Sequence, residues 1–598
     1  MPADNQEFLA AYQRELIFLR QMGAEFAQRY PKIAARLDLS EDTCADPHVE
    51  RLIESFAFLT ARLQGQLDAE FPVFTGALLG ALYPHFTAPM PSLTVARFVP
   101  DPDQPMPGSG YEVPRHTPLF TQGSNGALVR FRTCYPTTLW PVTLTEARVE
   151  NTDAYPFLDS MPKVAAVLRL RLTAGKGGFG DLSTLRFFVN AEPQTAFAVY
   201  DLLCSAVQGV ALCHDKKKDP VVVQPPSSIR PAGFADNETI LPTPEQGHPG
   251  YRLLQEYFAF PEKFLFFDLD LTALRQAKRT VDVLILLDEA PRRRLTIDAE
   301  TFALGCTPIA NLFERTTEPI RLEERQPEYR LVADSRQERS VGIHSLISVS
   351  ASEDPSTVET VEPIFSYRHP ADTDNAVFFH AQRRPTGRAE VPGTDFFLTF
   401  VDMRMDLAHP PHKTVYAHTL CTNRDLAAQM PANAELSAED GGPFAAVVCL
   451  RKPTPQIDPP AGGASLWRLI SQLSLNHLSL SGGDGSLSAL KELLRLYRFN
   501  PLQSEDQING IRKMACRPIL RHLGEDAWRG FRQGLEVTLT FDETLYVGSS
   551  ALLLSAVLSR FFGLYAAINS FTQLVVRSEQ RQEKWKVWEP LAGALAVL

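Results

Sequence analysis

Two aspartates, Asp268 and Asp270, lie in the segment FLFFDLDLTAL (264–274) of this 598-residue chain, at a spacing that suits catalysis. The carboxylate of Asp268 could attack a phosphoryl group, with Asp270 as a general acid beside a Mg²⁺ ion. The same segment is also typical of a β-strand. Alternation with period two would place both aspartates on one face of that strand, with Phe267 and Leu269 on the other.

The surrounding sequence decides between these two interpretations. The segment resembles the DxDxT signature of haloacid-dehalogenase-like phosphotransferases, in which the first aspartate is the nucleophile. The parallel βα units expected after that signature are missing, and the next acidic strand end, at Asp288 and Glu289, comes too soon. We therefore favour the strand and predict neither an enzyme nor a cofactor. A Mg²⁺-dependent phosphotransferase with Asp268 as nucleophile is the alternative.

A glycine-rich stretch, GKGGFG (175–180), satisfies the dinucleotide-binding pattern G-x-G-x-x-G, and Asp201 follows at the distance of a ribose-binding acid. Such a loop must open a helix, so that the phosphates meet the positive helix end. The residues that follow, DLSTLRFFV, instead predict a strand. We expect a hairpin loop here.

Possible metal ligands lie at His409, His412, His418 and Cys421. Zinc needs four converging nitrogen or sulfur ligands. His418 and Cys421 are three residues apart in a predicted strand, so their side chains point to opposite faces. We predict no metal site. A nucleophile elbow of the G-x-S-x-G type and a P-loop are also absent from the sequence.

Composition narrows the function classes further. The net charge of −11 argues against a nucleic-acid-binding protein. The eight cysteines are scattered without a CxxC pair, which is typical of reduced, mostly buried thiols in the cytosol. The N-terminus lacks the features of a signal peptide. Polar residues interrupt the most apolar stretch, Ala551 to Val576, so no membrane span is predicted.

The chain is expected to be a multidomain α+β protein. Residues 1–92 predict a helical region, with one helix from about Asn5 to Tyr30, a second that begins at Asp46 and ends at Pro72, and a short third from Thr75 to Leu82. Residues 93–250 and 251–460 predict two β-rich domains, the first with one helix at 194–207. Residues 461–598 predict a helix-rich α/β domain, including helices at 466–475, 487–496 and 503–514 and a long helix from Ser549 or Ser550 to Val576.

The helix that begins at Asp46 carries the clearest apolar periodicity in the chain. Its apolar residues recur three and four positions apart and line one side: Val49, Leu52, Ile53, Phe56, Leu59, Leu63 and Leu67. Two packing partners are possible, namely the core of its own domain or a bundle shared between subunits. Periodicity alone favours the private core.

Several long blocks resemble one protein family, the TssF (VasA or ImpG) baseplate subunits of type VI secretion systems. The similar blocks are YQRELIFLRQMGAEFAQRYPKIAARL (12–37), DPHVERLIESFAFLTARL (46–63), ALYPHFTAPMPS (81–92), TLCTNRDL (419–426) and FFGLYAAINSFTQL (561–574). The blocks touch both ends and the middle of the chain. Such long matches outweigh the short patterns above.

The resemblance implies a structural role in a contractile injection machine. TssF-like proteins join TssG in a wedge, with two TssF copies for each TssG, and wedges surround a VgrG spike. TssK connects wedges to the membrane complex, and TssE links them toward the sheath. The family is similar to phage baseplate wedge proteins. It carries no catalytic residues over to this chain and implies a cytoplasmic location at the inner membrane, with membrane contact only through TssK.

With the resemblance in hand, the balance shifts toward a shared bundle. We expect Leu16, Phe26, Phe56, Leu59 and Leu63 to contribute to a bundle with TssG or with a second copy of the chain. A second candidate surface contains Phe561, Tyr565 and Phe571 on the C-terminal helix, where contact with a partner and burial in the same domain both remain open.

Overall fold

The computed structural model describes residues 2–592 except 35–46, 83, 124–125, 176–177, 215–219, 221, 243–248, 275–278, 292–294, 324–325, 353–357, 365–376, 389, 392, 403–413, 460–466, 468, 471–484, 498–500, 523–530, 564–565 and 567–569. The chain divides into two compact units. The helical unit contains Met1–Ala81 and Pro460–Leu473, and the main unit contains Leu82–Pro459 and Ser474–Leu598. Most of the predicted helix at 466–475 lies outside the described residues.

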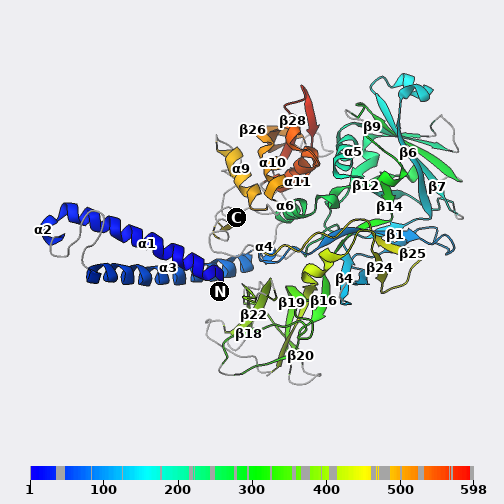
Figure 1. Ribbon diagram of the computed structural model, residues 1–598. Helices are drawn as coiled ribbons and strands as arrows, with labels where there is room; N and C mark the ends of the chain where they lie inside the picture. The colour runs from blue at the N-terminus through cyan, green and yellow to red at the C-terminus, as the bar shows by residue number, and fades with distance from the viewer. Residues whose placement is uncertain are drawn as a thin grey trace. The chain divides into compact units, whose positions relative to one another are not determined.

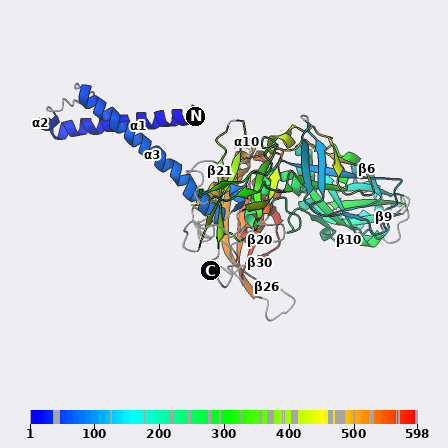
Figure 2. The same cartoon turned by 90° about the horizontal axis from the view of Figure 1, so that it is seen from below.

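The helical unit is built on α1 (Pro2–Arg29), α2 (Pro31–Ala34) and α3 (Pro47–Leu82). Helices α1 and α3 form a long helical pair (Figures 1 and 2), in which Arg20 of α1 bonds Glu50 of α3. The prediction that Pro72 ends the second helix is wrong, because α3 runs on through the predicted third helix for 36 residues, about 54 Å at 1.5 Å per residue. A proline removes one helical hydrogen bond, and the turns on either side of Pro72 tolerate that loss.

The main unit begins with α4 (Pro84–Thr87) and contains a closed barrel. Its strands alternate between inward apolar and outward side chains, and Phe98, Phe131 and Ile309 are among the residues that fill the barrel core. The barrel strands, in spatial order, are β1 (Leu93–Pro100), β15 (Cys306–Ala310), β4 (Leu128–Thr133), β3 (Pro118–Gln122), β24 (Glu435–Ala438) and β25 (Phe444–Cys449).

Two further sheets also combine strands from both sides of residue 250. One contains β10 (Val222–Gln224), β9 (Val207–His214), β13 (Thr280–Leu287), β7 (Ala166–Ala174) and β6 (Val142–Glu150). The other contains β11 (Ile229–Pro231), β12 (Phe266–Asp270), β8 (Thr184–Val189) and β14 (Phe302–Leu304). Helix α5 (Pro193–Ser205) forms where the sequence predicted one. The β-rich texture is confirmed, but these sheets and the barrel cross the expected boundary between 93–250 and 251–460.

The residues between 313 and 422 form two smaller sheets around a separate apolar core that includes Val349, Leu398 and Ala417. One contains β16 (Phe313–Thr316), β23 (Thr414–Thr422), β19 (Gly342–Ser352), β20 (Val358–Val361) and β17 (Ile320–Arg321). The other contains β18 (Tyr329–Arg330), β22 (Thr394–Val401) and β21 (Phe378–Pro385). A two-stranded sheet pairs β2 (Tyr111–Val113) with β5 (Thr137–Leu139).

The C-terminal module is built around α11 (Ala551–Gly563), which packs on α6 (Pro249–Ala259) and on β28 (Phe571–Ser578). Helix α11 links β27 (Phe531–Phe541) to the parallel strand β28, as a crossover must. The other elements are α9 (Ser486–Arg495), α10 (Pro501–Asn509), β26 (Ile511–His522), β29 (Lys584–Val587) and β30 (Leu591–Ala592).

Two helix predictions in this module extend too far. The long helix was expected to reach Val576, but α11 ends at Gly563 and the run FTQLVV forms β28, because its β-branched residues pair with β27. The helix expected at 503–514 ends as α10 at Asn509, and β26 begins at Ile511.

Short 3₁₀ helices form several connections of the main unit. They are η1 (Thr152–Ala154), η2 (Pro156–Ser160), η3 (Pro226–Ser228), η4 (Pro261–Phe264), η5 (Thr272–Leu274), η6 (Ala299–Thr301), η7 (Arg424–Gln429) and η8 (Glu543–Leu545).

Candidate interaction surface

The aspartates of the DxD pattern lie on β12, as the strand interpretation predicted. Phe267 and Leu269 are buried on one face, and the two aspartates lie on the other. Arg186 of β8 is paired directly across from Asp268, and its Nε and Nη2 donate to the two carboxylate oxygens at 2.7 and 2.8 Å. The carboxylate of Asp270 accepts hydrogen bonds from Thr272 N at 2.9 Å and Thr272 Oγ1 at 2.6 Å, which lower its pKa. Both aspartates are therefore engaged in structural contacts.

The glycine-rich stretch leads into a strand, β8, as predicted, but it is not a hairpin loop. Strand β7 before it and β8 after it belong to different sheets, so the stretch passes from one sheet to the other. Gly180 has a φ of 54°, and a Cβ there would lie 2.4 Å from the Gly108 carbonyl oxygen. Asp201 is partly buried in α5, where its carboxylate accepts a hydrogen bond from the Ser550 hydroxyl. The glycines thus serve close packing.

The possible zinc ligands do not converge. His418 is exposed and its Nδ1 lies 3.0 Å from Thr316 Oγ1, whereas Cys421 is fully buried on the same strand, β23. Burial raises the pKa of the Cys421 thiol to about 11. His409 and His412 lie outside the described residues. No three metal-ligating side chains come together within the part of the chain that the structure describes.

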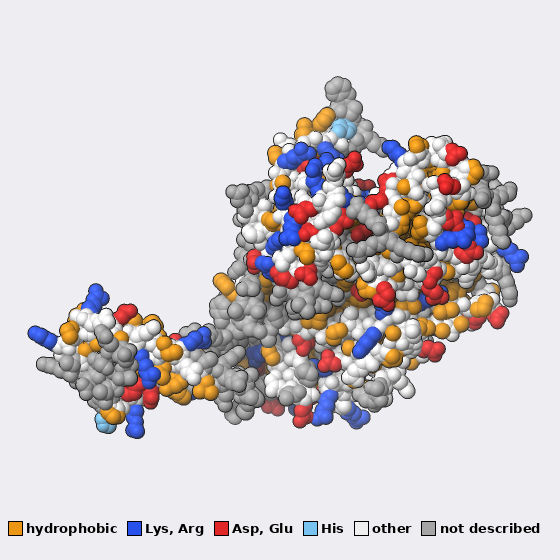
Figure 3. Space-filling view, turned by 45° about the horizontal axis from the view of Figure 1, so that its top comes forward, with side chains coloured by type: hydrophobic (Ala, Val, Ile, Leu, Met, Phe, Trp, Pro, Cys, Tyr) orange, Lys and Arg blue, Asp and Glu red, His pale blue; other side chains and the backbone are white. Residues whose placement is uncertain are grey.

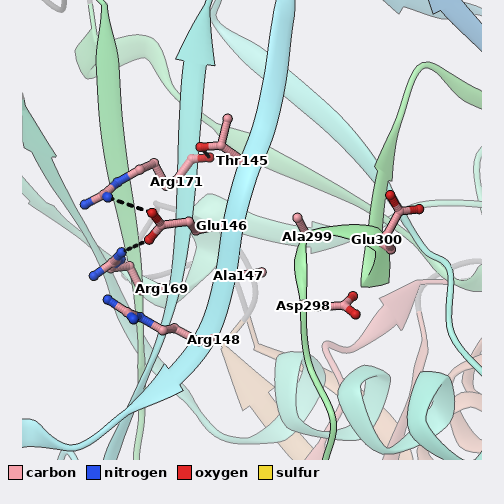
Figure 4. Close-up of a pocket in the computed structure, with 9 residues that line it drawn as sticks. All are labelled: Thr145, Glu146, Ala147, Arg148, Arg169, Arg171, Asp298, Ala299 and Glu300. Atoms are coloured by element: carbon pink, nitrogen blue, oxygen red, sulfur yellow. Dashed lines mark hydrogen bonds and ion pairs between the residues drawn. The ribbon is translucent and has the colours of Figure 1, made fainter.

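An open cavity of about 560 Å³ lies between β6, β7 and the residues around η6 (Figure 4). Figure 4 shows Glu146 between Arg169 and Arg171, and Arg171 Nη1 donates to Glu146 at 3.0 Å. Arg171 Nε also donates to Asp282 at 2.7 Å, and Arg169 Nη1 donates to Glu150 at 2.9 Å. These arginines are already neutralised by carboxylates of the chain. The sequence reasoning missed this network, although the Arg-x-Arg alternation of β7 was a signal for it.

The largest concentration of exposed apolar side chains among the described residues belongs to the helical unit. Among the described residues, 22 large apolar side chains are exposed, and 12 of these lie between Leu9 and Leu63. Figure 3 shows apolar side chains across the surface of this unit. A monomeric protein rarely leaves so much apolar surface open to water, so this concentration is the best candidate for an interaction surface.

Helix α3 has two different faces in its described part. Ala57 and Ala61 are fully buried on one side, where small side chains allow another element to approach closely. Glu50 lies on that side too and accepts a hydrogen bond from Arg20 Nε of α1 at 3.1 Å. The opposite side is an apolar stripe with exposed fractions of 69% for Leu52, 60% for Phe56, 54% for Leu59 and 60% for Leu63. Their spacing of four, three and four residues keeps them on one face.

The predicted residues of α1 contribute less. Leu16 is half-buried, so it packs mainly within its own unit. Phe26 is 38% exposed, and its ring lies tilted against that of Tyr30 with ring centroids 5.2 Å apart. Phe18 and Met22, which the sequence reasoning did not select, are exposed at four-residue spacing with Phe26 and extend its face.

At the second predicted surface, partner contact and burial were both left open, and its described residues are buried. Phe561 is fully buried and Phe571 is 1% exposed, because α11 and β28 pack into the core of the main unit. Tyr565 lies outside the described residues. Phe561 contacts Tyr251 of α6, with ring centroids 5.7 Å apart. These two phenylalanines are core residues, and the stripe on α3 is the better candidate site.

Comparison with known proteins decides the family. The family model "Type VI secretion system, TssF" matches residues 4–595. This chain belongs to the TssF family. It is 37% identical over 621 residues to the type VI secretion system component TssF1 of Pseudomonas aeruginosa, with 99% of each chain covered.

Two solved structures share the fold of this TssF-family chain, each at 22% identity. One, from a TssK-TssF-TssG baseplate subcomplex, has a TM-score of 0.72 and covers 91% of this chain and 99% of its own. The other, from the baseplate complex of the type VI secretion system, has a TM-score of 0.59 and covers 99% and 100%. The chain is therefore a structural baseplate component of mixed α+β fold, from a family not known for enzymes, and the phosphotransferase alternative is set aside.

Proposed function

We propose that this chain joins TssG and TssK in a baseplate wedge, and that the apolar stripe of α3 (Leu52, Phe56, Leu59 and Leu63) supplies the main contact with TssG or a second copy of the chain. The exposure of these four side chains, each above one half, is the observation that carries the proposal. Permanent interfaces between subunits resemble a protein core divided in two, with large apolar side chains from both partners.

The geometry of α3 supports a shared bundle. Four large apolar side chains follow one another along one exposed face of the helix. Covering them with another helix would stabilise the complex, because burial contributes about 25 cal/mol per Å² of apolar surface. Phe18, Met22 and Phe26 on α1 offer a second apolar face for the same bundle, with Leu16 behind it. Residues 1–92 thus serve as the bundle-forming region of the protein.

The remaining assignments follow from family membership and the related solved structures. A solved relative comes from a TssK-TssF-TssG baseplate subcomplex, which supports TssG and TssK as partners. We extend this to two copies of the chain per TssG, as the family resemblance implies, with TssE and the VgrG spike as further neighbours. The assembled wedge would lie in the cytoplasm at the inner membrane. No described helix has the length and apolar character needed to cross a membrane.

Charge introduced into the apolar stripe tests the proposal. The double variant Leu59→Asp/Leu63→Asp should lose co-purification with co-expressed TssG, by at least tenfold, because two carboxylates would be desolvated in the interface. The control is Arg51→Asp, which adds an acid at an exposed position of the same helix outside the stripe. Native mass spectrometry of the purified complex reports the stoichiometry. Undiminished complex formation by the double variant, with a folded main unit, would refute the assignment.

A further inference from the structure

Strands β26 and β27 form a long antiparallel ribbon with two different halves. The register runs from Ile511 opposite Phe541 at the base to His522 opposite Phe531 at the far end. The base belongs to the core, since Val537, Leu539 and Phe541 are at most 2% exposed. At the far end, Leu520 is 62% and Phe531 is 63% exposed, and Figure 2 shows β26 extending away from the module. The distal half therefore stabilises no core of the chain itself.

One face of the distal half is basic. Strand alternation and register place Arg517, Arg521 and Arg532 on the same face, together with Glu536. Glu536 is the one carboxylate in the described part of the ribbon, and Arg517 Nε donates to it at 2.5 Å. In the space-filling view, Lys and Arg side chains gather at the top of the molecule over this module (Figure 3).

Arg521 lies directly opposite Arg532 in this register. Like charges directly opposite each other destabilise a pair of strands. Among the described residues, Arg521 has a longer-range attraction to Glu536, and no close ion pair is formed by Arg521 or Arg532. An anionic partner would offset the repulsion between the two cations.

The other face of the distal half is mostly apolar. Pro518 and Leu520 alternate with the arginines on β26, with Leu535 and Gln533 opposite them on β27, and Phe531 lies opposite His522 at the far end. The ribbon thus presents cations on one side and exposed apolar side chains on the other, at the same distance from the base. In a bilayer, the charged layer and the apolar layer lie at different depths. The charged and apolar sides of the ribbon lie at the same distance from its base, so the ribbon does not match a bilayer. The net charge of −11 also opposes approach to nucleic acid.

We infer that the distal half of the β26–β27 ribbon docks in a groove of another protein, with an acidic wall against Arg521 and Arg532 and an apolar wall against Leu520 and Phe531. The ribbon is a second interaction surface, distinct from the stripe of α3, and it does not depend on the function assigned to that stripe.

Photocrosslinking in the intact bacterium tests the ribbon. The full chain carries p-benzoylphenylalanine in place of Phe531, and a parallel chain carries it in place of Val547, which is 67% exposed in the same module. Mass spectrometry identifies the crosslinked peptide. We expect a protein adduct at position 531, with a peptide from the apolar wall of the groove, and a yield at least tenfold above that at position 547.

Charge reversal then tests the acidic wall. Arg521→Glu/Arg532→Glu should reduce the crosslink at position 531 at least tenfold, and lysines in place of the acids of the crosslinked partner's acidic wall should restore it. The matched control is Arg577→Glu/Lys584→Glu, a pair of exposed cations that also face each other. The single variant Arg532→Glu should have a Tm no lower than that of the unaltered chain, because it replaces a like-charge pair by an opposite-charge pair.

The inference is overturned if the crosslink at position 531 is no stronger than that at position 547, or if a protein crosslink survives charge reversal. It is also overturned if the adduct is to lipid, shown by flotation with the membrane fraction, or to nucleic acid, shown by its loss on nuclease treatment. The stripe on α3 is unaltered in all of these chains. Failure at the ribbon is thereby distinguished from failure of the Leu59→Asp/Leu63→Asp test.

Discussion

The described part of α3 and helix α11 are both rich in leucine and phenylalanine, yet their side chains meet opposite environments. Eleven of the 13 residues of α11 are buried, including Leu552, Leu554 and Phe561. On α3, Leu52, Phe56, Leu59 and Leu63 are all more than half exposed. An apolar helix face therefore has two uses in this protein. In α11 it completes the core of the chain, and in α3 it stays exposed in the single chain, where we propose that a partner covers it.

The same contrast holds for charged residues. In the main unit, Glu256 of α6 and Lys263 are both fully buried and bonded to each other. In the helical unit, Arg20 and Glu50 are bonded at the surface, with side chains 47% and 23% exposed. Buried pairs hold their surroundings together because neither charge can return to water, whereas surface pairs contribute little. The main unit should thus depend on its polar contacts far more than the helical unit does.

The largest effect is expected from Glu256→Ala. The Glu256 carboxylate also accepts hydrogen bonds from the backbone N–H groups of Ile240 and Leu241 at 2.9 and 3.0 Å. Its removal leaves those donors and the Lys263 ammonium buried without their acceptor, and burial already lowers the pKa of Lys263. We expect a loss of about 3–5 kcal/mol in the free energy of unfolding of the main unit, measured by urea titration.

The control for this prediction is Glu50→Ala in the helical unit. Because the Arg20–Glu50 pair is partly exposed, its loss should cost at most about 1 kcal/mol. Equal losses for Glu50→Ala and Glu256→Ala would show that the two units do not differ in their dependence on ion pairs.

Local features of the fold could be predicted from the sequence, but the assembly of its sheets could not. Strand β4, Leu128–Thr133, is the kind of element that a local pattern predicts, because its β-branched and aromatic residues alternate with arginines. Barrel strand β1, however, pairs with β15 and β25, more than 200 residues away. Such pairings depend on packing between distant segments, which no local window contains, so the expected boundary at residue 250 did not correspond to a division between sheets.

For the candidate sites, too, the sequence predicted local features but not contacts between distant segments. The face of α3 was predictable, since spacing alone groups Phe56, Leu59 and Leu63. Whether a face is covered by the chain itself depends on tertiary packing, and for Phe561 the sequence left both outcomes open. The role of Asp268 likewise became clear only with Arg186, which comes from a strand 82 residues earlier.

An intermediate, pH-dependent effect is expected from Asp201→Asn. Burial raises the pKa of Asp201 to about 7, so the folded chain binds a proton between about pH 4 and 7 that the unfolded chain has released. Stability therefore falls as pH rises through this window, by about 1.4 kcal/mol per pH unit for one such group. Asparagine can still accept the Ser550 hydrogen bond and carries no charge.

Urea titrations at pH 5, 6, 7 and 8 measure this difference. The Asn variant should lack the downward slope of the parent chain over the window and should be the more stable of the two at pH 8. A parallel slope in both chains would assign the proton to another group. Because Asp201 belongs to the main unit, the helical signal of α1 and α3 should not follow this pH dependence.

The smallest effect, and the most direct test of the comparison, is expected from Leu59→Ala. Because Leu59 is 54% exposed, the substitution should change the free energy of unfolding of the isolated chain by no more than about 0.5 kcal/mol. The same substitution at the fully buried Leu554 should cost about 2–5 kcal/mol through lost burial and a cavity. Urea titration followed by circular dichroism measures both. A cost above about 2 kcal/mol for Leu59→Ala would mean that the chain covers this side chain by itself, and the contrast between α3 and α11 would disappear. If the cost is small in the isolated chain but the variant binds TssG more weakly, the energy of the stripe is realised only in the complex, as expected of a surface that completes a core shared between two proteins.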